Sequence, residues 1–331
     1  MIALISKEDM VPFLQAVSRK MEVVAPVMDQ GTPAYVTWKG QPLALEGENP
    51  LVSPVKLLYP QREVLFRYIQ ECGSYTFEEP EQKARLILGV RPCDMQALKV
   101  LDSLLYPEPT DQAYQNRRRS AVIAAVSCVD PGVGCFCAQI GSGPECKEGC
   151  DLLFTDLGPR YLVETFSPAG VLMLKEHPEF FTPATRSHLQ EKERLLKEAR
   201  EKIVQARPWI SREGMAEAIK NADWKSLGER CLSCGGCSFI CPVCHCFSIY
   251  DQGVPDGERV RCADSCILSG FSRMTSGANP RPDPGQRLCN WYLDKFEYTP
   301  QKTGHLGCVG CGRCNRVCLS AIDRWSQEVL K

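Results

Sequence analysis

The sequence predicts an N-terminal domain of the α+β or α/β class, followed by a mainly helical, cysteine-rich domain. Two apolar segments flank a helical segment before residue 130, which is the pattern of a βαβ unit. A charged segment of helical periodicity follows near the middle of the chain, and beyond it cysteine and glycine become frequent. We therefore expect domains at 1–183 and 213–331, joined by a helical linker at 184–212.

The elements of the first domain follow from the periodicity of its apolar residues. Residues 8–22 have the spacing of an opening helix, and 34–38 (AYVTW) that of a short strand. Apolar runs at 84–90 and 120–128 predict two strands, with a helix over 93–105 between them. Strands joined through a helix are expected to be parallel neighbours.

Two later segments complete this outline. Residues 152–164 (LLFTDLG and RYLVE) predict a hairpin or an antiparallel edge. Residues 186–207 combine many charges with a thin apolar stripe, which is typical of a solvated connecting helix. We assign this helix to the linker.

Composition excludes several classes of protein. With 44% hydrophobic residues among 331, the chain can bury a normal core. Lys and Arg number 39 against 40 Asp and Glu, so a net charge of -1 gives no general attraction to nucleic acid or to an anionic membrane. No apolar run reaches the ~18 residues of a spanning helix, and the N-terminus carries acidic residues without a long apolar stretch. We therefore expect no membrane span, no signal peptide and a cytoplasmic location.

Twenty cysteines are unusual for a chain of this length. A disulfide framework is the simplest interpretation, but thiols in the cytoplasm stay reduced. The cysteines also fall in tight local groups, as metal ligands and redox-active thiols do. Metal binding or redox chemistry is therefore the favoured class.

Two cysteine runs of the C-terminal domain share the pattern C-x2-C-x2-C-x3-C, the spacing of bacterial-type two-cluster ferredoxins. The first run holds Cys231, Cys234, Cys237 and Cys241, and the second holds Cys308, Cys311, Cys314 and Cys318. Three closely spaced cysteines can wrap three corners of a [4Fe–4S] core, whereas the fourth lies nearly one helical turn further and faces the other core. We therefore expect cluster A to be held by Cys231, Cys234, Cys237 and Cys318, and cluster B by Cys308, Cys311, Cys314 and Cys241.

Structural zinc is the alternative for these runs. Zinc normally takes two separated pairs of cysteines, and a third and fourth cysteine repeated twice do not fit that pattern. Glycines at 235, 236, 310 and 312 let the loops pass close to an inorganic core. Sixty-six residues separate Cys241 from Cys308, more than in a compact ferredoxin, so we expect a helical two-cluster ferredoxin domain.

A further group of cysteines lies in the N-terminal domain, with Cys146 nearby. Its members are Cys93, Cys128, Cys135 and Cys137. Two of them end predicted strands and two lie on the following loop, so all four could meet at the carboxyl edge of the sheet. We expect a third metal centre here, an iron-sulfur cluster with zinc as the alternative, and buried thiols without a metal remain a second alternative.

The last group of cysteines, Cys244, Cys246 and Cys266, has two interpretations. They could begin an extra cluster, or they could surround cluster B and tune its potential. Because Cys244 follows Cys241 closely, chain geometry favours tuning. His245 between them is more typical of a local hydrogen-bonded histidine than of a ligand.

Several motifs together resemble a known family. They are RPCD at 91–94, CVDPGVGCFC at 128–137, CLSCGGCSFICPVCHCF at 231–247, SGANPRP at 276–282 and CVGCGRC at 308–314. The sequence is similar to the iron-sulfur electron-transfer subunits of sulfhydrogenases (the beta subunit) and of anaerobic sulfite reductase. The resemblance covers most of the chain from about residue 84 onward.

The resemblance implies a subunit that is not catalytic by itself. Such a subunit carries electrons between a flavin-containing, NAD(P)H- or ferredoxin-linked subunit and a separate catalytic subunit. Two positions depart from the family pattern: Leu319 replaces a proline after the fourth cysteine, and Ala263 replaces a tryptophan before Ser265-Cys266. We expect Cys150, Cys262 and Cys289 to be small buried apolar residues, and we assign no role to Cys72 or Cys146.

Two other functions compete with electron relay. One is a flavin- or substrate-binding oxidoreductase whose N-terminal domain holds the cofactor. The chain lacks GxGxxG, P-loop and nucleophile-elbow motifs, which argues against a nucleotide or hydrolytic site of its own. The other is a zinc-stabilised scaffold or nucleic-acid-binding protein, which the balanced charge disfavours.

Overall fold

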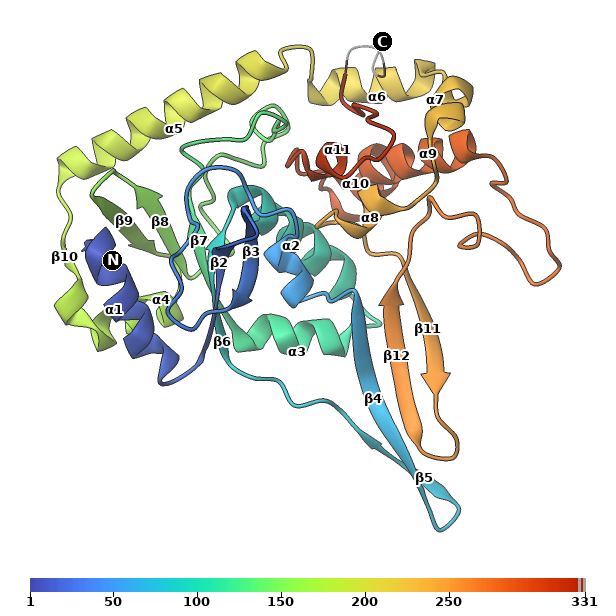
Figure 1. Cartoon of the computed structure of the whole chain (residues 1–331), viewed down its shortest axis with the longest axis horizontal. Helices are drawn as coiled ribbons and strands as arrows, with labels where there is room; N and C mark the ends of the chain where they lie inside the picture. Colours follow the sequence, from blue (N-terminus) through green and yellow to red (C-terminus); the bar gives the residue numbers. More distant parts are fainter. Residues whose placement is uncertain (327–328, 330–331) are drawn as a thin grey trace.

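The computed structural model describes residues 1–326 and 329, and its largest element is an eight-stranded mixed sheet (Figure 1). The strand order is β10-β1-β9-β8-β7-β6-β2-β3. The strands are β1 (Ile2–Ser6), β2 (Glu22–Asp29), β3 (Thr32–Thr37), β6 (Arg85–Val90), β7 (Ala121–Val126), β8 (Leu152–Asp156), β9 (Arg160–Thr165) and β10 (Thr182–Pro183). The four central strands β2, β6, β7 and β8 are parallel, and the outer pairs are antiparallel.

Helices cover both faces of the parallel centre, because its strands are apolar on both sides. Leu86 and Leu88 of β6 pack with α1 (Lys7–Ser18) and α4 (Pro168–Glu176). Ile87 of β6 lies in the opposite core. That second core also contains residues of α2 (Pro92–Leu105), α3 (Gln112–Ser120) and the 3₁₀ turn η1 (Pro54–Leu57).

The predicted elements of this region are confirmed with small shifts at their ends. The opening helix ends at Ser18, because the chain then enters β2. β6 and β7 are parallel neighbours connected through α2, as expected. β8 and β9 form the predicted antiparallel pair. The short helix α3 directly before β7 was not predicted.

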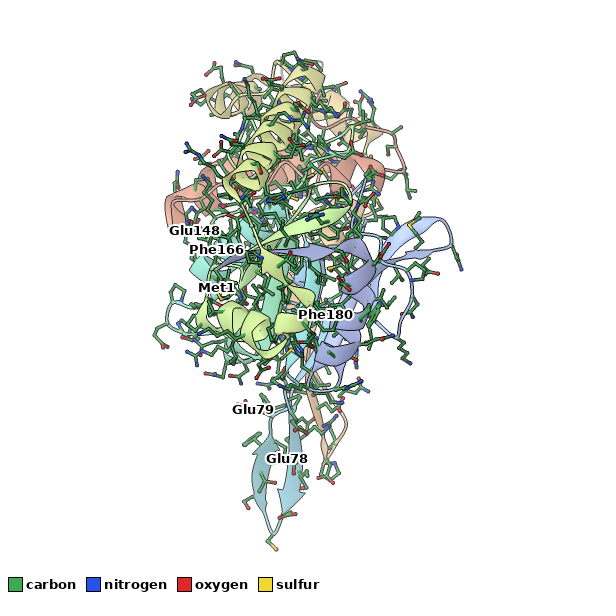
Figure 2. All side chains as sticks on the ribbon, turned by 90° about the vertical axis from the view of Figure 1, so that its left-hand side faces the viewer. Met1, Glu78, Glu79, Glu148, Phe166 and Phe180 are labelled. Carbon is green, nitrogen blue, oxygen red and sulfur yellow. The ribbon has the colours of Figure 1, made fainter. Side chains whose placement is uncertain are left out.

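A second, four-stranded antiparallel sheet projects from the body as an arm (Figures 1 and 2). Its strands, in spatial order, are β11 (Phe247–Gln252), β12 (Gly257–Ala263), β4 (Arg62–Glu71) and β5 (Ser74–Glu78). The pairing of β12 with β4 joins segments from both sides of the expected linker. The expectation that the C-terminal part is mainly helical is not confirmed, since its hairpin completes a sheet begun near residue 62.

The expected connecting helix is present as α5 (Arg186–Ala206), which runs along one side of the molecule (Figure 1). Its apolar stripe, including Leu196, Ala199 and Ile203, is buried. The remaining helices are short: α6 (Arg212–Asn221), α7 (Trp224–Arg230), α8 (Gly236–Phe239), α9 (Pro284–Leu293), α10 (Thr299–Thr303), α11 (Arg313–Arg316), the 3₁₀ turn η2 (Pro178–Phe180) and the π-helical turn η3 (Asp294–Tyr298). None of the helices described here combines the length and apolar character that crossing a membrane requires.

Candidate metal centres

The two cysteine runs adopt the same local structure. In each, a glycine with a positive φ begins a short helix: Gly235 (φ +74°) begins α8 and Gly312 (φ +72°) begins α11. This left-handed conformation favours glycine because it has no Cβ. The third cysteine of each run therefore lies in the first turn of a helix, and the fourth follows its end. The helices α8 and α11 contact each other (Figure 1), so the two runs face one another.

A cavity forms where the end of the first run meets the second. The cysteines that line it are Cys241, Cys308, Cys311 and Cys314. These are the four residues expected for cluster B. The cavity is small, with a volume of ≈ 20 Å³.

Hydrogen-bond donors point at the sulfurs of this cavity. The backbone N–H of Gly310 donates to Cys308 Sγ (3.5 Å), and the indole N–H of Trp325 donates to Cys314 Sγ (3.2 Å). Burial raises the pKa of the Cys314 thiol to about 12, so this thiol would be protonated without a metal. Iron would displace its proton, because metal binding to cysteine requires the thiolate. Buried thiols with N–H donors directed at their sulfurs fit an iron-sulfur cluster.

The residues expected for cluster A lie nearer the surface. The backbone N–H of Ser233 donates to Cys231 Sγ (3.4 Å), while Cys234 is exposed. The guanidinium of Arg324 lies beside the sulfurs of Cys237 and Cys318, which come from different runs. Burial opposes the Cys318 thiolate, but the hydrogen bond from Arg324 lowers the pKa of this thiol below its ordinary value. Among the residues described by the structure, no three His, Cys, Asp or Glu side chains form a site for a single metal ion.

The N-terminal cysteines meet at a second cavity, as their positions after the strands predicted. It is lined by Cys93, Cys128, Cys135 and Cys137, and also by Cys311 of the second run. Its volume is ≈ 20 Å³. Cys93 lies in the first turn of α2 and Cys128 just beyond β7, so the carboxyl edge of the sheet borders this cavity. Burial raises the pKa of the Cys135 thiol to about 12.

The loop that carries Cys135 and Cys137 lies directly against the second cysteine run. The N–H of Phe136 donates to the carbonyl of Gly310 (2.9 Å). A Cβ placed on Gly310 would lie 2.6 Å from the backbone nitrogen of Cys137, and one on Gly312 would lie 2.7 Å from the carbonyl oxygen of Gly134. Only glycine allows so close an approach. Cys311 thus lies between the two cavities and lines both.

A buried ion pair explains the last residue of the RPCD motif. Asp94 in α2 accepts two hydrogen bonds from the guanidinium of Arg313 in α11, at 2.6 and 2.9 Å. Both side chains are fully buried, and Ser53 also donates to Asp94 (2.6 Å). The pair ties the N-terminal sheet region to the second cysteine run. Sequence reasoning singled out the motif but did not identify Arg313 as its partner, because 219 positions separate them.

Of the remaining group, Cys244, Cys246 and Cys266, the first lies with Cys241 beside one lysine. Cys246 and Cys266 are neighbours of each other. The ammonium of Lys295 lies 3.4 Å from both Cys241 Sγ and Cys244 Sγ. Lys295 was not predicted as a site residue. Its only signal in the sequence is its place shortly before the second run.

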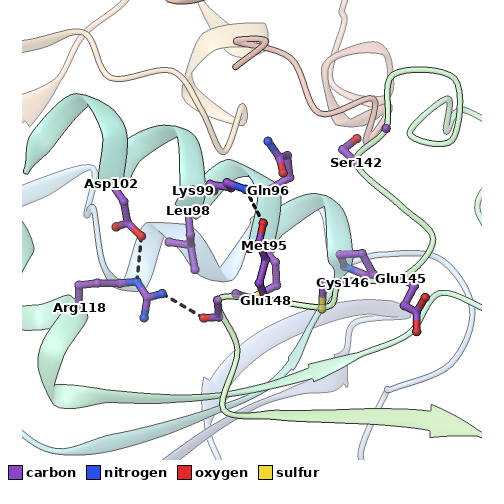
Figure 3. A pocket seen from close by; sticks show the side chains of 13 residues that line it. Met95, Gln96, Leu98, Lys99, Asp102, Arg118, Ser142, Glu145, Cys146 and Glu148 are labelled. Carbon is purple, nitrogen blue, oxygen red and sulfur yellow. Dashed lines mark hydrogen bonds and ion pairs between the residues drawn. The ribbon is translucent and has the colours of Figure 1, made fainter. Parts of the chain in front are cut away.

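The other cysteines lie outside these groups. The thiols of Cys146 and Cys150 are buried and 3.8 Å apart, and Cys146 also lines an open pocket between α2, α3 and the loop near Glu148 (Figure 3). Cys262 and Cys289 are half-buried rather than buried as expected, because they lie on elements at the surface. Cys72 is exposed.

Comparisons with known proteins support iron-sulfur clusters in the region of the two cysteine runs. Residues 230–322, which contain both cysteine runs, match the family described as a 4Fe-4S dicluster domain. The sulfhydrogenase 2 subunit beta of Pyrococcus furiosus is 31% identical over 288 residues, which is 85% of this chain and 83% of that protein. This similarity extends well beyond the cysteine runs and confirms the resemblance seen in the motifs. The chain therefore belongs to the family of the sulfhydrogenase beta subunit, an iron-sulfur family of electron-transfer proteins.

Proposed function

We propose that this chain is the electron-transfer subunit of a cytoplasmic, anaerobic oxidoreductase complex. Single electrons would pass through its [4Fe–4S] clusters between a flavin-containing, NAD(P)H- or ferredoxin-linked subunit and a catalytic subunit. That catalytic subunit would be of the hydrogenase, sulfite reductase or heterodisulfide-reductase type. The name of the relative, a sulfhydrogenase subunit beta, supports a complex of several chains.

Two clusters would occupy the ferredoxin-like region. Cluster A would be held by Cys231, Cys234, Cys237 and Cys318, and cluster B by Cys241, Cys308, Cys311 and Cys314. The cavity around the second set supports this assignment, as does the contact between α8 and α11. Each cluster would supply one-electron chemistry when bound, and the protein would supply thiolates and N–H donors that set its potential.

A third cluster would occupy the cavity of the N-terminal cysteines. Cys93, Cys128, Cys135 and Cys137 would be its ligands, with zinc as the alternative metal. These thiols line one cavity although they come from a helix, a strand end and a loop. Their convergence is easier to explain by a shared ligand than by apolar packing alone.

The observation that carries the relay is the position of Cys311. It lines the N-terminal cavity and the cluster B cavity at once, so any groups bound there are immediate neighbours. The helices that carry the two runs are in contact, and Cys234 is exposed. The order would therefore be third centre, cluster B, cluster A, with cluster A facing a redox partner.

Purification of the complex from its native host tests the function. We expect the chain to copurify with a flavoprotein and a catalytic redox subunit, and its clusters to be reduced by NAD(P)H or ferredoxin only when the flavoprotein is present. Acid treatment of the isolated chain should release no flavin. Direct reduction of the isolated chain by NAD(P)H, with release of a flavin, would favour the flavin-binding oxidoreductase instead.

Metal analysis tests the third centre. The isolated chain should contain about twelve iron atoms and no zinc, and Cys137→Ser should remove about four of them. Cys289→Ser, which changes a half-buried cysteine outside all three groups, is the matched control and should keep the full complement. About eight iron atoms in the unmodified chain would remove the third cluster, and about one zinc atom in addition would assign the cavity to zinc.

A further inference from the structure

Lys295 is a fully buried cation among sulfurs. Its side chain is about 2% exposed. Its ammonium donates to Cys241 Sγ (3.4 Å), to Cys244 Sγ (3.4 Å) and to the carbonyl of Gly307 (3.2 Å). An ammonium has three donors, and these contacts use all of them. The Trp291 ring lies on another side, with its centroid 4.7 Å from the nitrogen.

The charge of Lys295 has no carboxylate partner among the ion pairs of the described residues. Burying an unpaired ammonium is costly, so such a group normally has a compensating negative charge. The ammonium instead contacts Cys241 Sγ and Cys244 Sγ, and Cys241 would carry a negative charge as a cluster-bound thiolate.

A π-helical turn of the backbone holds Lys295 in this position. Residues Asp294–Tyr298 form a π-helical turn between α9 and α10. Such turns are rare and occur often at functional sites. The N–H of Gly307, immediately before the second run, donates to the carbonyl of Lys295 (2.7 Å). The lysine is therefore held to the second run by its backbone and to the end of the first run by its side chain.

We propose that Lys295 is a positioning residue that raises the reduction potential of cluster B. Reduction of a bound cluster by the proposed flavin-containing partner would add one electron without breaking a bond, and a fixed positive charge beside Cys241 would stabilise the added negative charge. Cys244 shares this ammonium and acts as its second sulfur partner rather than as an iron ligand. The inference rests on the proposed function, because it assumes that Cys241 binds cluster B.

A redox titration of the full-length chain, followed by EPR, tests this role. In Lys295→Met the one-electron equilibrium of cluster B should shift at least tenfold toward the oxidised form, which is about 59 mV to more negative potential. Lys295→Arg keeps the charge and should stay near the unmodified value. Lys302→Met removes an exposed lysine of the nearby helix α10 and should change nothing. The signal of cluster A should not move in any variant.

Two results of the titration would overturn the inference. One is an unchanged potential of cluster B in Lys295→Met; the other is a shift in Lys295→Arg as large as that in Lys295→Met. If the Lys295→Met variant does not bind cluster B, the Lys295→Gln variant is measured instead. A bound cluster with a more negative potential in Lys295→Gln supports tuning. Loss of iron from Lys295→Gln as well would mean that Lys295 is needed for cluster assembly, which would overturn the inference. Absence of clusters from the unmodified chain would refute the proposed function itself. Failure of the proposed function is therefore distinguishable from failure of the inference about Lys295.

Discussion

Individual glycines determine how closely the loop of Cys135 and Cys137 approaches the second cysteine run. Gly310 has a φ of +61°, and its Cα faces the backbone of Cys137. A side chain at this position would meet two obstacles, a strained backbone and a collision with main-chain atoms that cannot rotate away. Gly304 has a φ of +74° but open space around it. A side chain at Gly304 would therefore meet only the backbone strain and no collision.

Gly310→Ala should therefore destabilise the chain more than Gly304→Ala. The backbone penalty of about 1–2 kcal/mol is common to both, and the clash at Gly310 should add about 1–3 kcal/mol. Midpoints of anaerobic chemical denaturation measure the difference. Equal midpoints for the two variants would mean that the loop around Cys137 does not lie against the second run.

The assignment of cysteines to clusters makes a second prediction at this scale. Cys318→Ser should abolish the same EPR signal as Cys231→Ser, although the two cysteines lie in different runs. Cys241→Ser should likewise abolish the same signal as Cys308→Ser. Each single change should lower the iron content by up to about four atoms. If the signal lost in Cys318→Ser is instead the one lost in Cys308→Ser, each run holds its own cluster.

Among the elements, α2 and α11 are joined by the pair of Asp94 and Arg313. Removing one partner of a buried pair leaves an uncompensated charge, which is far more costly than the loss of a surface pair. The pair also positions Cys93, next to Asp94, relative to Cys314, next to Arg313. Stability and the spacing of two proposed clusters thus depend on one contact.

Asp94→Asn should lower the free energy of unfolding by about 3–5 kcal/mol. The matched control is Glu198→Gln, which removes an exposed partner of Arg194 on α5 and should cost less than about 0.5 kcal/mol. Denaturation midpoints of the two variants provide the comparison. A change in Asp94→Asn as small as in the control would contradict the role of this pair.

Elements with local signals could be predicted, and elements that depend on distant partners could not. The parallel pair of β6 and β7 follows from apolar runs that neighbour each other in the sequence. The strands β4 and β12 carry mixed polar and apolar residues and form local hairpins with β5 and β11. The two hairpins become one sheet only through the pairing of β4 with β12, about 190 positions apart in the sequence. Single-sequence periodicity contains no information about such a partner.

In the whole molecule, the N-terminal cysteine group lies next to the second cysteine run, and the second run lies next to the first. Spacing predicted the two runs, and strand ends predicted the N-terminal group. What spacing could not predict was their junction at Cys311, because it depends on glycine contacts and on the pair of Asp94 and Arg313. The division at 184–212 stays a prediction, since the arm combines strands from both sides of it.

The number of electrons that the isolated chain accepts tests the relay most directly. Coulometric reduction under anaerobic conditions, with EPR to count unpaired spins, should give about three electrons per chain, one for each [4Fe–4S] cluster. Cys137→Ser should accept about two. A chain that accepts no electrons, or that contains zinc in place of iron, would contradict the account.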